Sequence, residues 1–328
     1  MNKRFLFVIG ALLVAAIGCD REPCAACREE QELRHIHLES APDELQQDGG
    51  ELNVAGSRLY VFTPAGDLVC CYSSSEGAYD FFLTDDVYDF VAVVNKDDLP
   101  SDGVTRSALL STLTTLTENA PDRLVMRGTL DAHRIETDEK ITLEAQRVAA
   151  KVTCVLRTAF PERLSALPFE IDALYLTNVA GAHLLSLSDL APDASACWFN
   201  RMDVEESEDG VPFDLIFKQV RRRMGAAEVF DPGVSLYAYP NTCADDHDRT
   251  KWTARRTRLV VRARLGDRPT YYPVTLDSVL PNRHYRVDLT IAGFGVEHPE
   301  DRLSDYASLA ASLTLVPWDD GGSLEGSY

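Results

Sequence analysis

Two histidines and a glutamate lie at alternate positions early in the chain, where a metal ion could bind. His35, His37 and Glu39 would share one face of a β-strand, because successive side chains of a strand point to opposite faces. Imidazole nitrogens and carboxylate oxygens are both zinc ligands. Ile36 and Leu38 would form the opposite, apolar face. We therefore expect a half-buried surface strand with solvent-facing imidazoles, and no metal site.

An acidic run at Asp245-Asp246-His247-Asp248 is the second candidate for a metal ion, in this case calcium. It lacks the order of aspartates, the glycine and the later glutamate that an EF-hand loop requires. We interpret it as the polar tip of a hairpin.

Motifs for catalysis are absent from the sequence. It contains no GxSxG, no SxxK and no papain-type cysteine context, so no serine or cysteine has a recognisable base. It also lacks a glycine-rich phosphate loop, and in so acidic a chain paired carboxylates cannot be singled out. We expect a protein that is not an enzyme and that has no cofactor.

The first residues have the pattern of a lipoprotein signal peptide. Lys3 and Arg4 precede an apolar run, Phe5 to Ile17, which is shorter than the roughly 20 residues of a membrane-spanning helix. The run ends at Gly18-Cys19, which resembles a bacterial lipobox, although Ala16 stands where Leu is preferred. We expect residues 1–18 to be removed, Cys19 to carry the lipid and residues 19–32 to form a tether. An ordinary secretory signal is the alternative.

Eight cysteines occur in the chain. Cys24 and Cys27 form a CxxC pair, but no second pair follows at the spacing of a zinc ribbon. Export permits disulfides. The pairing of these two with the other cysteines stays open, and those others are Cys70, Cys71, Cys154, Cys197 and Cys243.

The composition of the chain argues against a nucleic-acid-binding function. The 328 residues are 45% hydrophobic and carry a formal charge of −20, which suits a globular protein of about two domains. A strongly acidic surface repels nucleic acid, so we expect no nucleic-acid partner. The basic clusters Arg221 to Arg223 and Arg255, Arg256 and Arg258 are short, and we interpret them as solvated strand ends.

Alternation of apolar and polar residues dominates the rest of the chain and predicts β-strands. Candidate strands occupy residues 33–38, 58–63, 68–72, 79–83, 87–95, 123–130, 141–160, 169–178, 213–220, 234–240, 259–265, 271–276, 285–291 and 309–316. One helix is expected after Ser101 or Asp102. Its apolar stripe would consist of Leu109, Leu110, Leu113 and Leu116.

This pattern predicts an all-β protein. We expect two tandem antiparallel β-sandwiches, residues 33–160 and 161–328, with the short helix in the first and a terminal strand closing the second.

The C-terminal motifs resemble those of the fimbrillins, the pilin subunits of Bacteroidales fimbriae. Tyr271-Tyr272-Pro273-Val274 is similar to a strand of that family. The segment from Asn282 to Ile291, followed by Gly293 and Gly295, is similar to another, and a last strand ending at Trp318 completes the order. Pro281 departs from the family, in which Arg or Glu often precedes the asparagine. The resemblance implies two transthyretin-like sandwiches and an exported lipoprotein at the cell outer membrane.

The resemblance also implies assembly with other fimbrial subunits by β-strand addition, in which a C-terminal strand fills an open sheet edge of a neighbour. The residues that would enter that groove are Leu309, Ala311, Leu313, Leu315 and Trp318. The same alternation would serve a strand that closes its own domain, so both alternatives stay open.

Two further questions concern the kind of subunit. In the family, a stalk subunit is cut after its first strand by an Arg- or Lys-directed protease, yet this chain has no Arg or Lys between Glu39 and Ser57. That favours a lipid-anchored, membrane-proximal subunit over a stalk subunit. The competing class is a carbohydrate-binding surface lipoprotein, whose aromatic platform would have to come from Trp198, Trp252 or Trp318.

Overall fold

The structure is a computed structural model that describes residues 32–42, 53–188, 192, 196–199, 210–244, 253–301 and 309–316. Most of these residues lie in β-strands, which confirms the all-β class. The described helices are single turns: α1 (Arg106–Leu110), the 3-10 turn η1 (Leu116–Glu118), α2 (Glu162–Ser165) and α3 (Phe213–Ile216). No described helix is long and apolar enough to cross a membrane.

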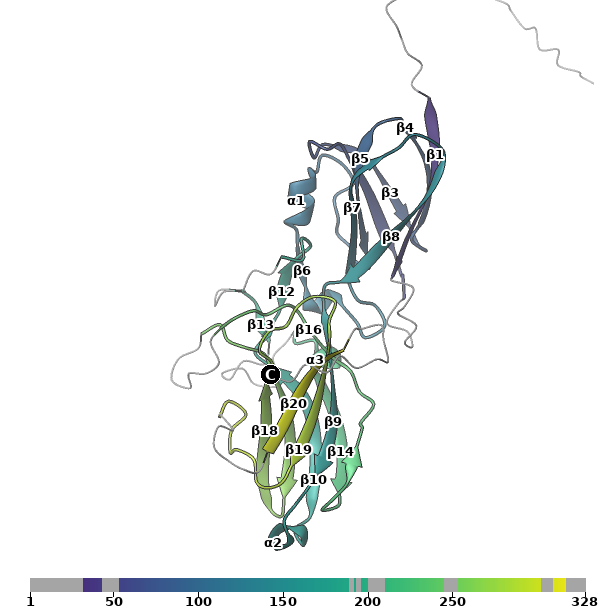
Figure 1. Cartoon of the computed structure of the whole chain (residues 1–328). Coiled ribbons are helices and arrows are strands. Elements are labelled where there is room, and N and C mark those ends of the chain that lie inside the picture. Colours follow the sequence, from purple (N-terminus) through teal and green to yellow (C-terminus); the bar gives the residue numbers. More distant parts are fainter. Residues whose placement is uncertain are drawn as a thin grey trace, which may run out of the picture. The chain divides into compact units, whose positions relative to one another are not determined.

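A seven-stranded sheet is formed by the first part of the described chain, in the order β3-β2-β5-β7-β8-β1-β4 (Figure 1). Its strands are β1 (Leu33–Pro42), β2 (Ser57–Phe62), β3 (Leu68–Ser74), β4 (Ala78–Thr84), β5 (Val87–Val94), β7 (Met126–Arg134) and β8 (Glu139–Arg147). Within this sheet, β1 and β8 are the one pair that runs parallel. Ile36 and Leu38 of β1 pack in one cluster with Leu59 and Val61 of β2, so the sheet folds over a core as a sandwich does.

Two facing sheets make up the second part. One contains β9 (Ala150–Thr158), β15 (Val229–Phe230), β16 (Leu236–Ala238), β19 (His284–Ile291) and β20 (Leu309–Val316). The other has the order β14 (Phe217–Met224), β10 (Phe169–Thr177), β17 (Arg258–Leu265), β18 (Arg268–Thr275). Side chains of both sheets, such as Val287 and Val261, share one buried cluster. The two sheets are therefore the layers of a second sandwich.

Short ladders and a continuous core connect the two parts. β6 (Leu113–Thr115) pairs with β12 (Ala182–Leu184), and β11 (Val179–Ala180) pairs with β13 (Trp198–Phe199). The cluster that fills the second sandwich also includes Tyr60 and Phe62 of β2. The division into domains at residue 160 stays a prediction. In the strand pairing, the change of sheet comes between β8 and β9, because β9 pairs in parallel with β19.

The predicted leucine-striped helix is wrong in its extent. α1 is one turn, capped by Thr105, whose hydroxyl accepts a hydrogen bond from the Ala108 amide at 3.3 Å. Leu113 instead begins β6, where it pairs with Leu184 and is 59% exposed. The helical spacing was coincidental, because pairing with a strand some 70 residues later in the chain determines the conformation here.

Two predicted strands and one basic cluster also differ from the structure. The run 141–160 is two strands, β8 and β9, and the run 213–220 starts with α3 before β14 begins. Arg221 to Arg223 lie exposed in edge strand β14, as solvated residues do. Arg255 and Arg258, however, are 0% and 1% exposed, so their interpretation as solvated residues was wrong.

Candidate functional site

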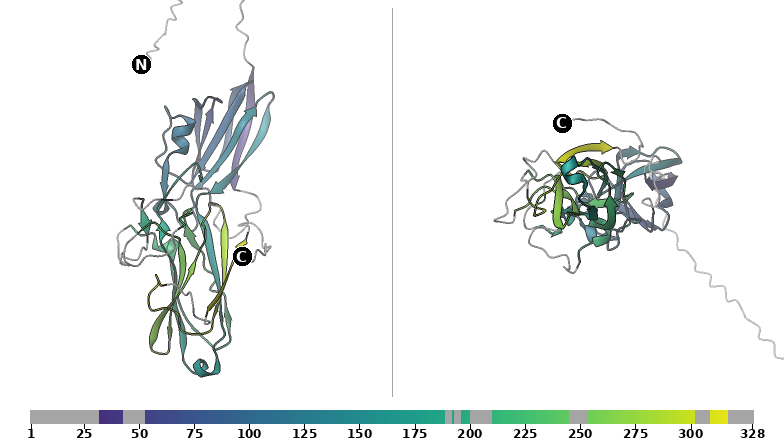
Figure 2. Two further views of the ribbon diagram at one scale, coloured as in Figure 1. Left: turned by 60° about the vertical axis from the view of Figure 1, so that its left-hand side comes forward. Right: turned by 90° about the horizontal axis from the view of Figure 1, so that it is seen from below.

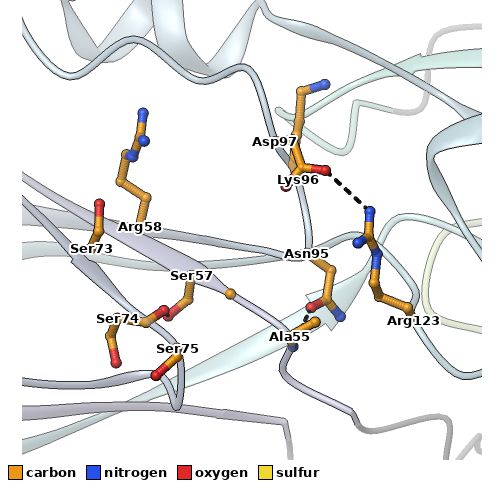
Figure 3. Close-up of a pocket in the computed structure, with 11 residues that line it drawn as sticks. Ala55, Ser57, Arg58, Ser73, Ser74, Ser75, Asn95, Lys96, Asp97 and Arg123 are labelled. Carbon is orange, nitrogen blue, oxygen red and sulfur yellow. Dashed lines mark hydrogen bonds and ion pairs between the residues drawn. The ribbon is translucent and has the colours of Figure 1, made fainter.

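A polar pocket of about 380 Å³ opens between β2, the end of β3 and the loop after β5 (Figure 3). Its lining consists of residues 55–58, 73–75 and 95–97 together with Arg123. Figure 3 shows Arg58 and Arg123 on different sides of the pocket, so these two cations do not converge on one point.

The charged and amide side chains of this pocket are engaged with the surrounding loops. Lys96 Nζ lies 2.7 Å from a Glu118 carboxylate oxygen, and Arg123 lies 3.3 Å from Asp97. The Asn95 amide nitrogen donates to two backbone carbonyls at 2.7 and 2.9 Å. Neither histidine nor cysteine lines the pocket to serve its serines as a base. These contacts hold the loop after β5 in place, and they do not form a catalytic arrangement.

The two histidines of β1 belong to an ion-pair ladder on the outer face of the first sheet. His37 Nδ1 lies 2.9 Å from Asp80 Oδ1 of β4, and His37 Nε2 lies 3.0 Å from Glu39 Oε1. The second Glu39 oxygen accepts from Lys140 of β8 at 2.8 Å, and His35 Nε2 lies 3.4 Å from Asp80. The hydrogen bonds to Asp80 and then Glu39 raise the pKa of His37 above its usual value.

This ladder connects β1 to both of its neighbours, β4 and β8. Among the described residues, no group of histidine, cysteine and acidic side chains is arranged to hold a metal ion. The ladder is therefore a set of surface ion pairs that help to retain β1.

None of the described cysteines is in a disulfide bond. Cys70 and Cys71 are neighbours in β3, so they point to opposite faces and cannot form a bond with each other without distortion. Burial raises the pKa of the Cys70, Cys71 and Cys154 thiols, which makes them poor nucleophiles. Cys197 is exposed and Cys243 is buried. Cys24 and Cys27 lie outside the described residues.

The predicted terminal strand is present as β20, and it pairs antiparallel with β19 of its own chain. Leu309, Ala311, Leu313 and Leu315 stand opposite Ile291, Leu289, Val287 and Tyr285, so the structure brings four of the five predicted interface residues to one row. Beyond β19, no described strand pairs with β20, and it is the edge of the sheet. Figure 2 shows β20 in yellow at the outside of the second sandwich.

Burial differs sharply between β20 and the strand it pairs with. In β19, Val287, Leu289 and Ile291 are 0% exposed. In β20, Leu315 is 42% exposed, Ala311 is exposed and Leu313 is only partly buried against the core. β20 thus adds hydrogen bonds to its sheet but contributes little side-chain burial.

Three sequence predictions fall outside the described residues: Cys19, Trp318 and the run Asp245 to Asp248. Of the tryptophans, Trp198 is buried, with 6% of its surface exposed, and it cannot serve as a sugar platform. Trp252 also lies outside the described residues.

Sequence reasoning missed a buried polar cluster around Glu300, which is 1% exposed and lies 3.5 Å from an Arg255 nitrogen. Pro299-Glu300 stands a few residues after the glycines of the motif segment, but nothing in the sequence distinguishes a buried glutamate from a solvated one.

Comparison with known proteins identifies the fold. No protein-family model matches the chain, and no curated protein matches it. Solved structures do. A fimbrillin from Porphyromonas gingivalis superposes with a TM-score of 0.64 at 14% identity, covering 87% of this chain and 97% of that one. A tip fimbrial protein from the same organism, with a C-terminal truncation, gives 0.52 at 13% identity and covers 88% and 100%.

The chain has the fold of the fimbrillins. The superposition covers nearly all of both chains, so the shared fold includes both the first sheet and the second sandwich. This agrees with the resemblance of the C-terminal motifs: Tyr271 to Val274 lie in β18, and most of the second motif forms β19. In this fimbrillin-like chain, β20 is an edge strand whose apolar row is incompletely buried.

Proposed function

We propose that the chain is a structural subunit of a cell-surface fimbria, and that it joins a neighbouring subunit by donating β20. The fimbrillin fold and the absence of a catalytic motif from the sequence support a structural role. The observation that carries the proposal is the position of β20 at a sheet edge with little burial of its own apolar row. A strand that loses little when it leaves can pair with the open edge of another sheet.

The subunit is best understood as the lipid-anchored one. β1 lies between β4 and β8, so its loss would leave a groove in the first sheet. Arg34 is inside β1, and Arg58 is inside β2, where cleavage would damage a core strand. There is no Arg or Lys between Glu39 and Ser57, so an Arg- or Lys-directed protease cannot cut after β1 and open the groove. A subunit that keeps β1 can donate a strand but cannot receive one there. Acylated Cys19 would then hold it at the outer membrane.

Anchoring has its own test, because it depends on Cys19 alone. Intact-mass analysis and membrane fractionation of the Cys19→Ser protein should show loss of the acyl mass and release from the membrane. Equal masses apart from the substitution, or unchanged membrane partitioning, would contradict lipid attachment.

Strand donation is tested with two matched aspartate variants of β20. Leu313→Asp places a carboxylate in the row that would enter the neighbour, and burying an unpaired charge costs several kcal/mol. Thr314→Asp places the same charge on the other face, opposite Arg286. We expect Leu313→Asp to abolish fimbriae on cells, seen by electron microscopy, while Thr314→Asp leaves them unchanged.

Thermal unfolding of the isolated variants completes this test. Leu313 is only partly buried in its own chain, so both isolated variants should melt within a few degrees of the wild type. A Leu313→Asp monomer that is unfolded at room temperature would contradict donation and would show that β20 closes its own sandwich.

A further inference from the structure

The segment Gly293–Asp301, which we call the clamp segment, connects β19 toward β20 and is held along β18. Val296 and Tyr271 exchange both backbone hydrogen bonds, at 2.9 and 3.0 Å. The Gly295 amide donates to Thr270 Oγ1 at 2.7 Å, and the Tyr272 hydroxyl donates to the Gly293 carbonyl at 2.8 Å. The free edge of β18 is therefore occupied by the protein's own backbone.

Gly295 shows how close this approach is. A Cβ at this position would lie 2.1 Å from the Tyr271 carbonyl oxygen and 2.9 Å from Thr270 Oγ1. Any other residue would have to move the segment away from β18.

The end of the clamp segment is fixed by a buried carboxylate. Glu300 accepts from Thr177 Oγ1 at 3.0 Å and from the Asn178 side-chain amide at 3.2 Å, and Arg255 lies 3.5 Å from its second oxygen. Arg255 is 0% exposed and Glu300 is 1% exposed, so this ion pair lies inside the protein.

Arg258 also contacts this end of the clamp segment, and it donates to the carbonyls of Pro299 and Asp301, each at 3.4 Å. Pulling the segment away would separate the buried carboxylate of Glu300 from Arg255, Thr177 and Asn178, and breaking a buried ion pair is strongly unfavourable. Among the described side chains of β20, none forms a buried ion pair of this kind.

We propose that Glu300 is a positioning residue that fixes the base of a movable arm: the chain stays attached through Asp301 when β20 leaves its sheet for the neighbouring subunit. This inference rests on the proposed strand donation, and it identifies the residue at which the movable arm begins. In the fimbria, Val296 would still pair with Tyr271, while the pairing of β20 with β19 would be lost.

Two engineered disulfides in the full chain test β20 and the clamp segment one at a time. The arm lock, Arg286→Cys with Thr314→Cys, joins positions that face each other in β19 and β20. The clamp lock, Tyr271→Cys with Val296→Cys, joins β18 to the clamp segment. Each is compared with the wild type in oxidised and reduced form, and fimbriae are counted by electron microscopy. We expect the oxidised arm lock to stop assembly, reduction to restore it, and the clamp lock to have no effect in either form.

The other outcomes discriminate between the claims. If both locks stop assembly, the clamp segment has to move and the inference is wrong, while donation of β20 stands. If the arm lock permits assembly, β20 does not leave its sheet, and the proposed donation fails together with the inference.

The role of Glu300 is measured by hydrogen exchange on Glu300→Gln. Because the change removes the carboxylate that Thr177, Asn178 and Arg255 contact, exchange at the Val296 amide should be faster by about tenfold or more. The Val261 amide in β17 serves as the internal control and should be unaffected, which excludes global unfolding. Unchanged exchange at Val296 would overturn the assignment of Glu300 as the fixed base.

Discussion

The two terminal strands of the described chain, β1 and β20, are attached in opposite ways. β1 has a partner on each side, and Ile36 and Leu38 are 0% exposed. β20 has one partner, β19, and its Leu315 is 42% exposed. Both strands show apolar alternation in the sequence, yet β1 contributes fully buried side chains to a core and none of the described side chains of β20, residues 310–316, is fully buried.

This difference indicates which strand can be exchanged. Removing β1 would expose two large apolar side chains, each worth about 1.5–3 kcal/mol when fully buried, and would open the sheet between β4 and β8. Removing β20 would make β19 the edge strand of its sheet, and β19 supplies core residues on this side of the sandwich. If β20 is donated as proposed, the chain would keep its first strand and release its last.

The largest expected effect compares one leucine of each strand. Leu38→Ala in β1 should lower the free energy of unfolding by about 2–5 kcal/mol, because it leaves a cavity in a packed core. Leu315→Ala in β20 should cost less than about 1 kcal/mol, because 42% of its surface is already exposed and its removal leaves no enclosed cavity. Urea unfolding of both variants measures the difference, and equal losses would remove the distinction between the strands.

A smaller effect concerns the protonation of His37, which binds β1 to β4. Its pKa is raised by the hydrogen bond to Asp80 and then by that to Glu39. Because the folded-state pKa is above the ordinary value, the stabilising contribution is fully present below about pH 6.5 and is lost as the pH rises through the folded-state pKa.

An NMR titration of His37 in the wild type and in Asp80→Asn tests this assignment. The pKa should fall toward its ordinary value in the variant, because the principal acceptor is lost. No fall in the variant would show that Asp80 does not hold the charged imidazole.

How far the sequence could predict this molecule is clearest in β19. Its alternating Tyr285, Val287 and Leu289 report a strand with one buried face, and the structure has that strand. The same pattern in Leu313 and Leu315 could not reveal that β20 is an edge strand, because alternation is a local property and does not identify strand partners. Whether the side chains of a strand are exposed depends on which strands pair with it and pack against it.

Long-range pairing also explains the remaining errors. Leu113 has helical spacing from Leu109, but its partner Leu184 makes it part of a strand. The burial of Arg255 depends on Glu300, which is 45 residues later in the chain and has no feature that marks it as a buried ion-pair partner. Residue type and spacing predicted the class of fold and the candidate strand, whereas the polar interior required the three-dimensional structure.

Native-state hydrogen exchange of the isolated chain tests the comparison of the two strands most directly. Amides of β20 that bond to β19 should exchange by local release of the strand, at least about 100-fold faster than the amides of β1 that bond to β4 and β8, which require opening of the first sheet. Protection of β20 equal to that of β1 would contradict the account, because it would mean that the last strand is as firmly part of its sheet as the first.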